Sequence, residues 1–138
     1  MREILFRGKR KDNGEWIEGY YRKKQDPFGN IQHLISYSKS PVAWGNRDVD
    51  PETVGQYTGL TDKNGKKIFE GDILSAYLDF DEDSPKELTY IQVVWNLVSW
   101  CIKEKGYIDP MVKKDCEVFE VAGNIFDNPE LIGKAEGD

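Results

Sequence analysis

The chain has 138 residues, the length of one ordinary domain, with 38% hydrophobic and 12% aromatic residues. Its formal net charge of −6 argues against a general nucleic-acid-binding protein, which needs a positive field to displace counterions. No apolar run is long enough for a signal peptide or a membrane span, so we expect a cytoplasmic protein that makes no membrane contact.

The N-terminal region is predicted to consist of strands. Ile4–Lys11 and Glu15–Arg22 flank the turn signal Asp12-Asn13-Gly14, which predicts a β-hairpin. A second turn is expected at residues 26–29, where proline and glycine occur together. Apolar and polar residues then alternate over residues 31–37, which predicts a third strand.

Two segments carry the signals of short helical turns, and an irregular segment precedes the first of them. Residues 40–50 contain Pro, Gly and Asn, so we expect a loop there with Trp44 in it. Asp50-Pro51-Glu52 then predicts a capped helical turn, because proline fits the first helical position. Residues 128–131, Asn-Pro-Glu-Leu, predict a second turn of this kind.

The most tightly specified segment runs from Val54 to Leu74. It holds two strand-like runs around a turn, and the corner Glu70-Gly71-Asp72 then starts a third apolar run. At this corner we expect the Asp72 carboxylate to accept backbone N–H bonds. The residues to which we assign structural roles in this segment are Gly55, Gly59, Asn64, Gly65, Gly71 and Asp72.

The rest of the chain continues the pattern of short strands. We expect strands at residues 73–80, 88–95, 97–104 and 117–121, with loops at 81–87 and 105–115. No apolar pattern with the 3.6-residue period of a helix is sustained anywhere. The sequence therefore predicts an all-β (mainly β) fold, either a small barrel or a sandwich.

Three stretches carry a family resemblance. They are MREILFRGKRKDNGEWIEGYY at the N-terminus, TVGQYTGLTDKNGKKIFEGDIL in the centre and EVFEVAGNIFDNPELI near the C-terminus. Together they resemble the YopX family of small bacteriophage and prophage proteins, in the same order and over nearly the whole chain. Ala122-Gly123 departs from the apolar residue that commonly precedes this glycine. The resemblance implies a phage or prophage origin and a small SH3-like barrel, but no established activity and no functional residues.

We expect one YopX-like domain over residues 1–138. No repeat and no low-complexity linker divides the chain. If the domain is subdivided, we expect an N-terminal hairpin region at residues 1–50 and the SH3-like barrel at residues 51–138.

The chain shows no catalytic constellation. His33 is the only histidine, and its neighbours in strand phase are mostly apolar, which is typical of a packed side chain. Cys101 and Cys116 have neither metal spacing nor an activating neighbour, so we expect reduced thiols. Residues 79–83 have the opening spacing of a calcium loop, but the glycine and glutamate that such a loop requires are absent. We therefore expect no enzymatic activity, no cofactor and no metal.

The aromatic residues are the best candidates for binding. Trp44 is expected to be exposed in its loop, and Arg22, Lys23 and Lys24 form a basic segment that follows a hairpin and is expected to project toward solvent. Our leading hypothesis is a non-enzymatic module that binds an unknown protein partner or forms a homo-oligomer through edge strands. The alternative is a nucleic-acid-binding module that uses the basic N-terminal hairpin and aromatic stacking, although the net charge disfavours it.

Overall fold

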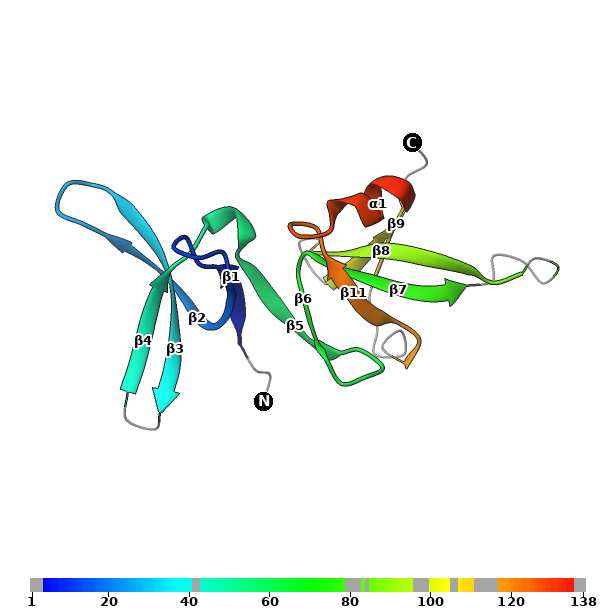
Figure 1. Cartoon of the computed structure of the whole chain (residues 1–138), viewed down its shortest axis with the longest axis horizontal. Coiled ribbons are helices and arrows are strands. Elements are labelled where there is room, and N and C mark those ends of the chain that lie inside the picture. Colours follow the sequence, from blue (N-terminus) through cyan, green and yellow to red (C-terminus); the bar gives the residue numbers. More distant parts are fainter. Residues whose placement is uncertain are drawn as a thin grey trace. The chain divides into compact units, whose positions relative to one another are not determined.

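A computed structural model describes residues 4–40, 43–78, 83, 85–95, 100–104, 107–110 and 117–135. Over these residues the chain is mostly β, with antiparallel strands throughout (Figure 1). The chain divides into two compact units, unit 1 from Met1 to Tyr57 and unit 2 from Thr58 to Asp138. The boundary falls within strand β5 (Gly55–Thr61).

Unit 1 contains β4, β3, β2, β1 and the start of β5, which belong to a six-stranded antiparallel sheet with the order β4-β3-β2-β1-β5-β6. Its strands before β5 are β1 (Phe6–Lys9), β2 (Trp16–Gln25), β3 (Ile31–Ser40) and β4 (Ala43–Asp48). The 3-10 helix η1 (Pro51–Thr53) follows β4, and the carboxylate of Asp50 caps it by accepting the N–H of Glu52. The predicted helical turn at Pro51 is therefore confirmed.

Both predicted turns of the N-terminal region are present. In the first, Gly14 adopts a φ of 74° and donates its N–H to the carbonyl of Arg10 at 2.9 Å. In the second, the carboxylate of Asp26 accepts the N–H groups of Phe28 and Asn30, both at 2.9 Å. These local bonds fix the β1–β2 and β2–β3 hairpins, as the turn chemistry predicts.

One face of the unit 1 sheet forms its core. Ile35 and Val49 are completely buried there. Gly8 lets Val49 approach the sheet, because a Cβ atom on Gly8 would lie 3.2 Å from the Val49 side chain. At Gly19 the approach is closer still, since a Cβ atom would lie 2.1 Å from the carbonyl oxygen of Ser36. No residue with a side chain fits at Gly19 without moving the backbone of β3.

Two segments that were predicted as loops contain strands. Strand β4 lies within residues 40–50, and β10 (Tyr107–Pro110) lies within residues 105–115 and pairs with β9 (Trp100–Glu104). Pairing with a neighbouring strand outweighs the weak strand propensity of Pro, Gly and Asn. Both β4 and β10 are edge strands of their sheets. An edge strand such as β10 tolerates a proline, which cannot donate a hydrogen bond to a neighbouring strand.

Unit 2 contains a five-stranded antiparallel sheet with the order β10-β9-β8-β7-β11. The remaining strands of the unit are β6 (Lys67–Phe69), β7 (Asp72–Leu78), β8 (Glu87–Trp95) and β11 (Glu120–Asn124). The all-β class is confirmed. The strands that the structure describes do not close into a barrel, because β10 and β11 are opposite edges of their sheet, so the finer expectation of an SH3-like barrel is not shown.

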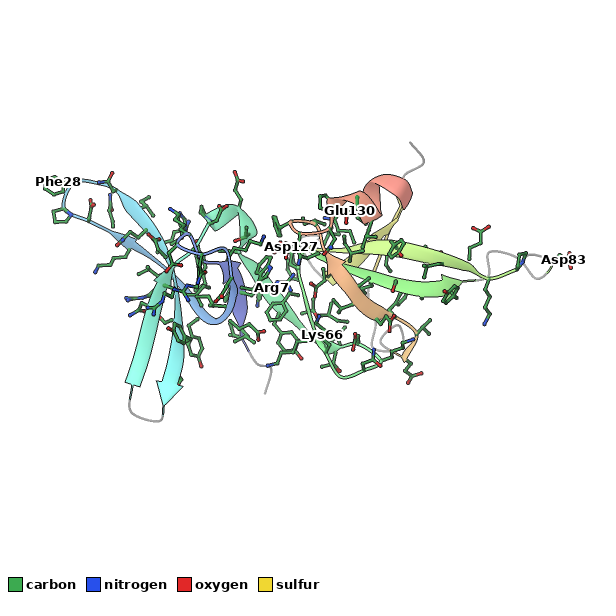
Figure 2. The ribbon with its side chains drawn as sticks, in the orientation of Figure 1. Arg7, Phe28, Lys66, Asp83, Asp127 and Glu130 are labelled. Atoms are coloured by element: carbon green, nitrogen blue, oxygen red, sulfur yellow. The ribbon has the colours of Figure 1, made fainter. Side chains whose placement is uncertain are left out.

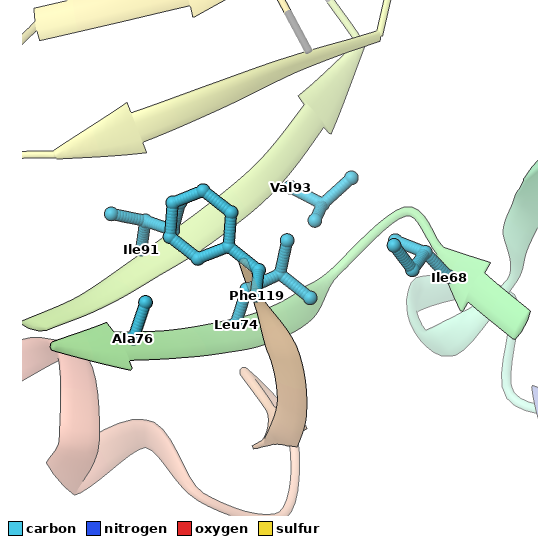
Figure 3. Close-up of a cluster of buried hydrophobic side chains, with 6 residues drawn as sticks. All are labelled: Ile68, Leu74, Ala76, Ile91, Val93 and Phe119. Carbon is cyan, nitrogen blue, oxygen red and sulfur yellow. The ribbon is translucent and has the colours of Figure 1, made fainter. Parts of the chain in front are cut away.

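The core of unit 2 gathers alternate residues of β7 and β8 with single residues of two other segments (Figure 3). Its members are Ile68, Leu74, Ala76, Ile91, Val93 and Phe119. Ile73, on the other face of β7, is also completely buried, so β7 lies inside the unit. Such two-sided burial explains the continuous apolar run that starts this strand.

The C-terminal helix α1 (Pro129–Ala135) begins at the predicted turn and continues beyond it, and it packs against β8. Among the described residues, helix is thus confined to short segments at Pro51 and Pro129, as predicted. None of the described helices has the length and apolar character to cross a membrane.

Candidate functional site

A buried carboxylate joins the β5–β6 hairpin to β11 in unit 2. Only 6% of Asp62 is exposed. Its Oδ1 accepts the N–H groups of Asn64 and Lys66, both at 2.9 Å, and its Oδ2 accepts the N–H of Val121 at 2.9 Å. The sequence analysis did not single out this residue. An aspartate two residues before Asn-Gly indicates this role, because a side chain at that position can accept backbone N–H groups of the turn.

The pKa of Asp62 results from two opposing effects of this arrangement. Burial by itself would raise the pKa of the carboxyl, because it disfavours the charged form. The three backbone N–H groups, helped by the charge of Lys66, outweigh burial and hold the pKa below its ordinary value. Asp62 is therefore an ionised structural residue and a poor candidate for a catalytic acid.

The glycines assigned to turns in this segment have clear conformational roles. Gly59 and Gly65 adopt φ values of 87° and 83°, which residues with a side chain rarely adopt. Gly65 lies in the turn at Asn64-Gly65 and donates its N–H to the carbonyl of Asp62 at 3.0 Å. Gly55 is buried at the start of β5, opposite Arg7. None of these glycines precedes a helix as a phosphate-binding loop does, because Gly55 and Gly59 lie in β5 and Gly65 lies between β5 and β6.

The Glu70-Gly71-Asp72 corner is also structural. Gly71 has a φ of 90°, donates its N–H to the carbonyl of Val93 at 3.0 Å and accepts the N–H of Ile125 at 2.9 Å. Asp72 is 1% exposed, and its Oδ2 accepts the N–H of Phe69 at 2.7 Å. The corner thus ties the central stretch of the sequence to the C-terminal stretch.

The C-terminal stretch is built around two asparagines that the sequence analysis did not single out. Oδ1 of Asn124 accepts the N–H groups of Phe126 and Asp127, and Oδ1 of Asn128 accepts the N–H of Asn124. A Cβ atom on Gly123 would lie 2.3 Å from Oδ1 of Asn128. The sequence Gly-Asn-x-x-x-Asn-Pro therefore encodes a compact turn that leads into α1.

Two isolated ionisable groups do not form a catalytic site. Burial raises the pKa of Glu70. The described residues contain no group of three or more His, Cys, Asp or Glu that could hold a metal ion.

His33 stacks on Tyr21, whose hydroxyl lies 2.6 Å from Nδ1 of the histidine, and Phe6 lies against the same tyrosine. His33 is thus a packed, hydrogen-bonded strand residue.

The unit 1 sheet presents cations and aromatic rings on the face opposite its core. Directly paired residues in antiparallel strands share a face, and Lys9 pairs with Trp16 while Arg7 pairs with Glu18. Alternate positions of β2 continue this face through Tyr20. We call it the basic aromatic face, formed by Arg7, Lys9, Trp16, Tyr20, Arg22 and Lys24.

Specific contacts organise the basic aromatic face. The guanidinium of Arg7 lies 4.7 Å from the ring centre of Trp16, and Nζ of Lys9 lies 5.6 Å from it. Tyr20 is 58% exposed, and Nη2 of Arg22 donates to Oδ1 of Asn46 at 3.4 Å. Figure 2 shows the side chain of Arg7 on the β1 side of this sheet. Cations beside exposed rings make a surface suited to binding.

Carboxylates interrupt this basic surface. Glu18 is exposed on the same face, and Asp48 joins it because both Asp48 and Arg22 pair with Leu34. Oδ1 of Asp48 is buried and makes no hydrogen bond within the part of the chain that the structure describes. The face therefore carries mixed charges with a positive excess.

The structure separates the residues predicted for binding. Arg22 and Lys24 are exposed on the basic aromatic face, whereas Lys23 pairs with His33 on the opposite face. Trp44 lies in β4 opposite Ser38, so its placement in a loop is wrong. Its side chain lies outside the described part of the chain, so its exposure stays a prediction.

Other predicted features also lie outside the described residues. Of the aspartates that resemble the start of a calcium loop, only Asp83 is described, and it is exposed. Cys101 lies in β9, but its thiol and all of Cys116 are not described. The reduced state of both cysteines stays a prediction.

Comparisons with known proteins agree on family and fold. Residues 5–133 match the model of a family described as YopX protein. The crystal structure of protein EF1440 from Enterococcus faecalis is similar to this chain, with a TM-score of 0.58 and 21% identity, over 96% of this chain and 99% of that one. At this identity the likeness shows the fold alone. No curated protein matches the chain.

Proposed function

The chain belongs to the YopX family, and from this premise we propose that it is a non-enzymatic phage or prophage accessory protein that binds a partner protein through unit 1. The observation that carries the proposal is the basic aromatic face. It brings two cations over Trp16 and leaves Tyr20 and Arg22 exposed. Aromatic and arginine side chains are the types that most often dominate binding energy at interfaces.

The division of charge between the units supports unit 1 as the binding part. Unit 1 contains ten Lys and Arg against eight Asp and Glu, a net charge of +2. Unit 2 contains nine against seventeen, a net charge of −8. The overall charge of −6 therefore conceals a basic unit, which would attract an acidic partner in the cytoplasm of a host cell.

The mixed charges favour a protein partner. Glu18 and Asp48 lie on the basic aromatic face, and a polyanion would be repelled by both. A protein surface can instead place its own donors against these carboxylates.

Quantitative capture from host cells tests this proposal. The tagged full chain is compared with an Arg22→Glu/Lys24→Glu variant of the face and with a matched Lys11→Glu/Lys86→Glu control. The control makes the same change in charge at exposed residues outside the face. We expect the face variant to recover about tenfold less of a specific partner, because two exposed contacts are reversed in charge, while the control matches the parent. Equal recovery by the parent, the face variant and the control would refute the proposal.

Single-stranded nucleic acid is a second candidate ligand for the same face. Cations beside Trp16 and an exposed Tyr20 on an antiparallel sheet are the features of platforms that stack bases and contact phosphates. Fluorescence anisotropy with a labelled oligonucleotide distinguishes this candidate. Binding that weakens steeply with salt and is lost in Tyr20→Ala would favour it over the protein partner.

We further propose that the chain has no hydrolase or nuclease activity. His33 is held against Tyr21, and within the described part of the chain no carboxylate bonds to the ring to orient it as a general base. Assays with generic nuclease and esterase substrates test this point. Turnover that disappears in His33→Ala would overturn it.

A further inference from the structure

The β2–β3 hairpin ends in exposed apolar surface. Phe28 is 89% exposed in its turn, and Ile31, at the start of β3, is 56% exposed. Lys23 is exposed on the same face of the hairpin as Ile31. We call Lys23, Phe28 and Ile31 the hairpin tip. Figure 2 shows Phe28 at the far end of this hairpin.

The turn beneath Phe28 is rigidly held. Asp26 accepts the backbone N–H groups of Phe28 and Asn30, and its Oδ2 also accepts the side-chain amide of Asn30 at 3.0 Å. Gly29 supplies the positive φ of 88° that completes the turn. A hydrophobic residue on such a preorganised turn loses little conformational entropy when it docks.

The β7–β8 hairpin of unit 2 ends in a surface of matching hydrophobicity and opposite charge. Tyr77 and Leu88 are directly paired, so their side chains share a face, and they are 65% and 46% exposed. Asp83 is exposed at the far end of this hairpin, as Figure 2 shows, and Glu87 is exposed next to Leu88 in the chain, on the other face of the hairpin. We call Tyr77, Asp83, Glu87 and Leu88 the acidic end.

We propose that the hairpin tip of one copy of the chain docks on the acidic end of a second copy. Phe28 would pack against Tyr77 and Leu88, and Lys23 would lie near the exposed carboxylates. The net charges of the units favour this pairing, because +2 and −8 attract whereas two copies of unit 2 repel. Contact between two hairpin tips would bring like charges together and is disfavoured.

This contact joins different surfaces on the two copies, so repeated docking produces a ring or an open chain of copies. Two hairpin ends bury less surface than a standard stable interface, so the association is weak and depends on concentration and salt. This self-association goes beyond the proposed function, which concerns a partner protein. Its residues lie outside the basic aromatic face, so the two proposals can fail separately.

Sedimentation velocity of the full chain over a concentration series tests the contact. We expect the mean mass to rise with concentration and to rise less at high salt. Phe28→Ala and Tyr77→Ala should each weaken association about tenfold, because each removes an apolar anchor. Ile4→Ala and Val118→Ala are matched controls at exposed apolar residues outside both surfaces, and they should leave association unchanged.

An exchange of charge between Lys23 and Glu87 tests whether the hairpin tip pairs with the acidic end. Lys23→Glu and Glu87→Lys should each weaken self-association about threefold, and an equimolar mixture of the two variants should form mixed assemblies through the reversed pair. Unchanged circular dichroism shows that each variant is folded. A parent that stays monomeric at every concentration, tip variants that associate like the parent, or a mixture without recovered association would each overturn the proposal.

Discussion

Units 1 and 2 use their side chains differently. Among the described residues, unit 2 buries eight apolar side chains deeply and unit 1 buries four. Unit 2 covers both faces of β7, whereas the basic aromatic face of unit 1 buries Leu34 but leaves Tyr20, Arg22 and Lys24 exposed. In unit 2, the stretches that identify the family hold its strands and turns in place. The N-terminal stretch instead supplies part of the basic aromatic face of unit 1. The comparison teaches that the same family pattern specifies the scaffold of unit 2 and part of the surface of unit 1.

Two aspartates with similar turn chemistry allow the units to be compared directly. Asp62 in unit 2 is buried and bonds to β11, whereas Asp26 in unit 1 is only half-buried and bonds within its own turn. We expect Asp62→Ala to lower the free energy of unfolding by about 3 kcal/mol, because it leaves three backbone donors without their charged acceptor. Urea unfolding measures this change. A loss below about 1 kcal/mol would contradict the structural role of Asp62.

A substitution in the turn at Asn64-Gly65 is expected to give the next largest loss of stability. Gly65 is exposed, and its φ of 83° would be strained for any residue with a side chain. We expect Gly65→Val to lower the free energy of unfolding by about 1–2 kcal/mol, from the left-handed backbone conformation alone, since no atom crowds the position. Thermal melting is the measurement. A variant that melts like the parent would show that the turn is wrongly assigned.

Asp26→Ala should have a smaller effect than Asp62→Ala. The backbone donors that Asp26 serves are exposed, so water can replace the lost hydrogen bonds. We expect a loss of about 1 kcal/mol in urea unfolding. Equal losses of stability in Asp26→Ala and Asp62→Ala would contradict the contrast between a buried scaffold in unit 2 and a local turn in unit 1.

The smallest expected effect is the loss of the stability that Asp62 contributes as the pH falls. The folded-state pKa of Asp62 lies below its ordinary value of 3.8, so its contribution is complete above that pH and is lost as the pH falls below it. Unfolding measured from neutral pH to below 3.8 should show a steeper loss for the parent than for Asp62→Asn. Parallel curves for the two proteins would contradict the lowered pKa.

Local chemistry made much of this fold predictable. The hairpin at residues 12–14, the turn at Asn64-Gly65 and the helical starts at Pro51 and Pro129 each depend on residues close in sequence. Strand β4 was missed because Gly45 and Asn46 have weak strand propensity, which its pairing with β3 outweighs. The open sheet of unit 2 could not be foreseen from alternation, which shows a buried face but does not fix which strands form the edges.

The candidate site was only partly predictable. The basic segment of β2 is visible in the sequence, but its division between two faces follows from the register with β3. That register separates Lys23 from Arg22 and places Arg22 beside Asn46. The role of Asp62 was hidden for the same reason, because its third donor, Val121, lies 59 residues away.

The central claim is that the basic aromatic face binds a partner without holding the fold together. The most direct test is a titration of the recovered partner against Arg22→Glu/Lys24→Glu, with urea unfolding of the same preparation. We predict an affinity about tenfold or more below that of the parent and a free energy of unfolding within about 0.5 kcal/mol of it. Unchanged affinity, or an affinity lost only together with stability, would contradict the claim.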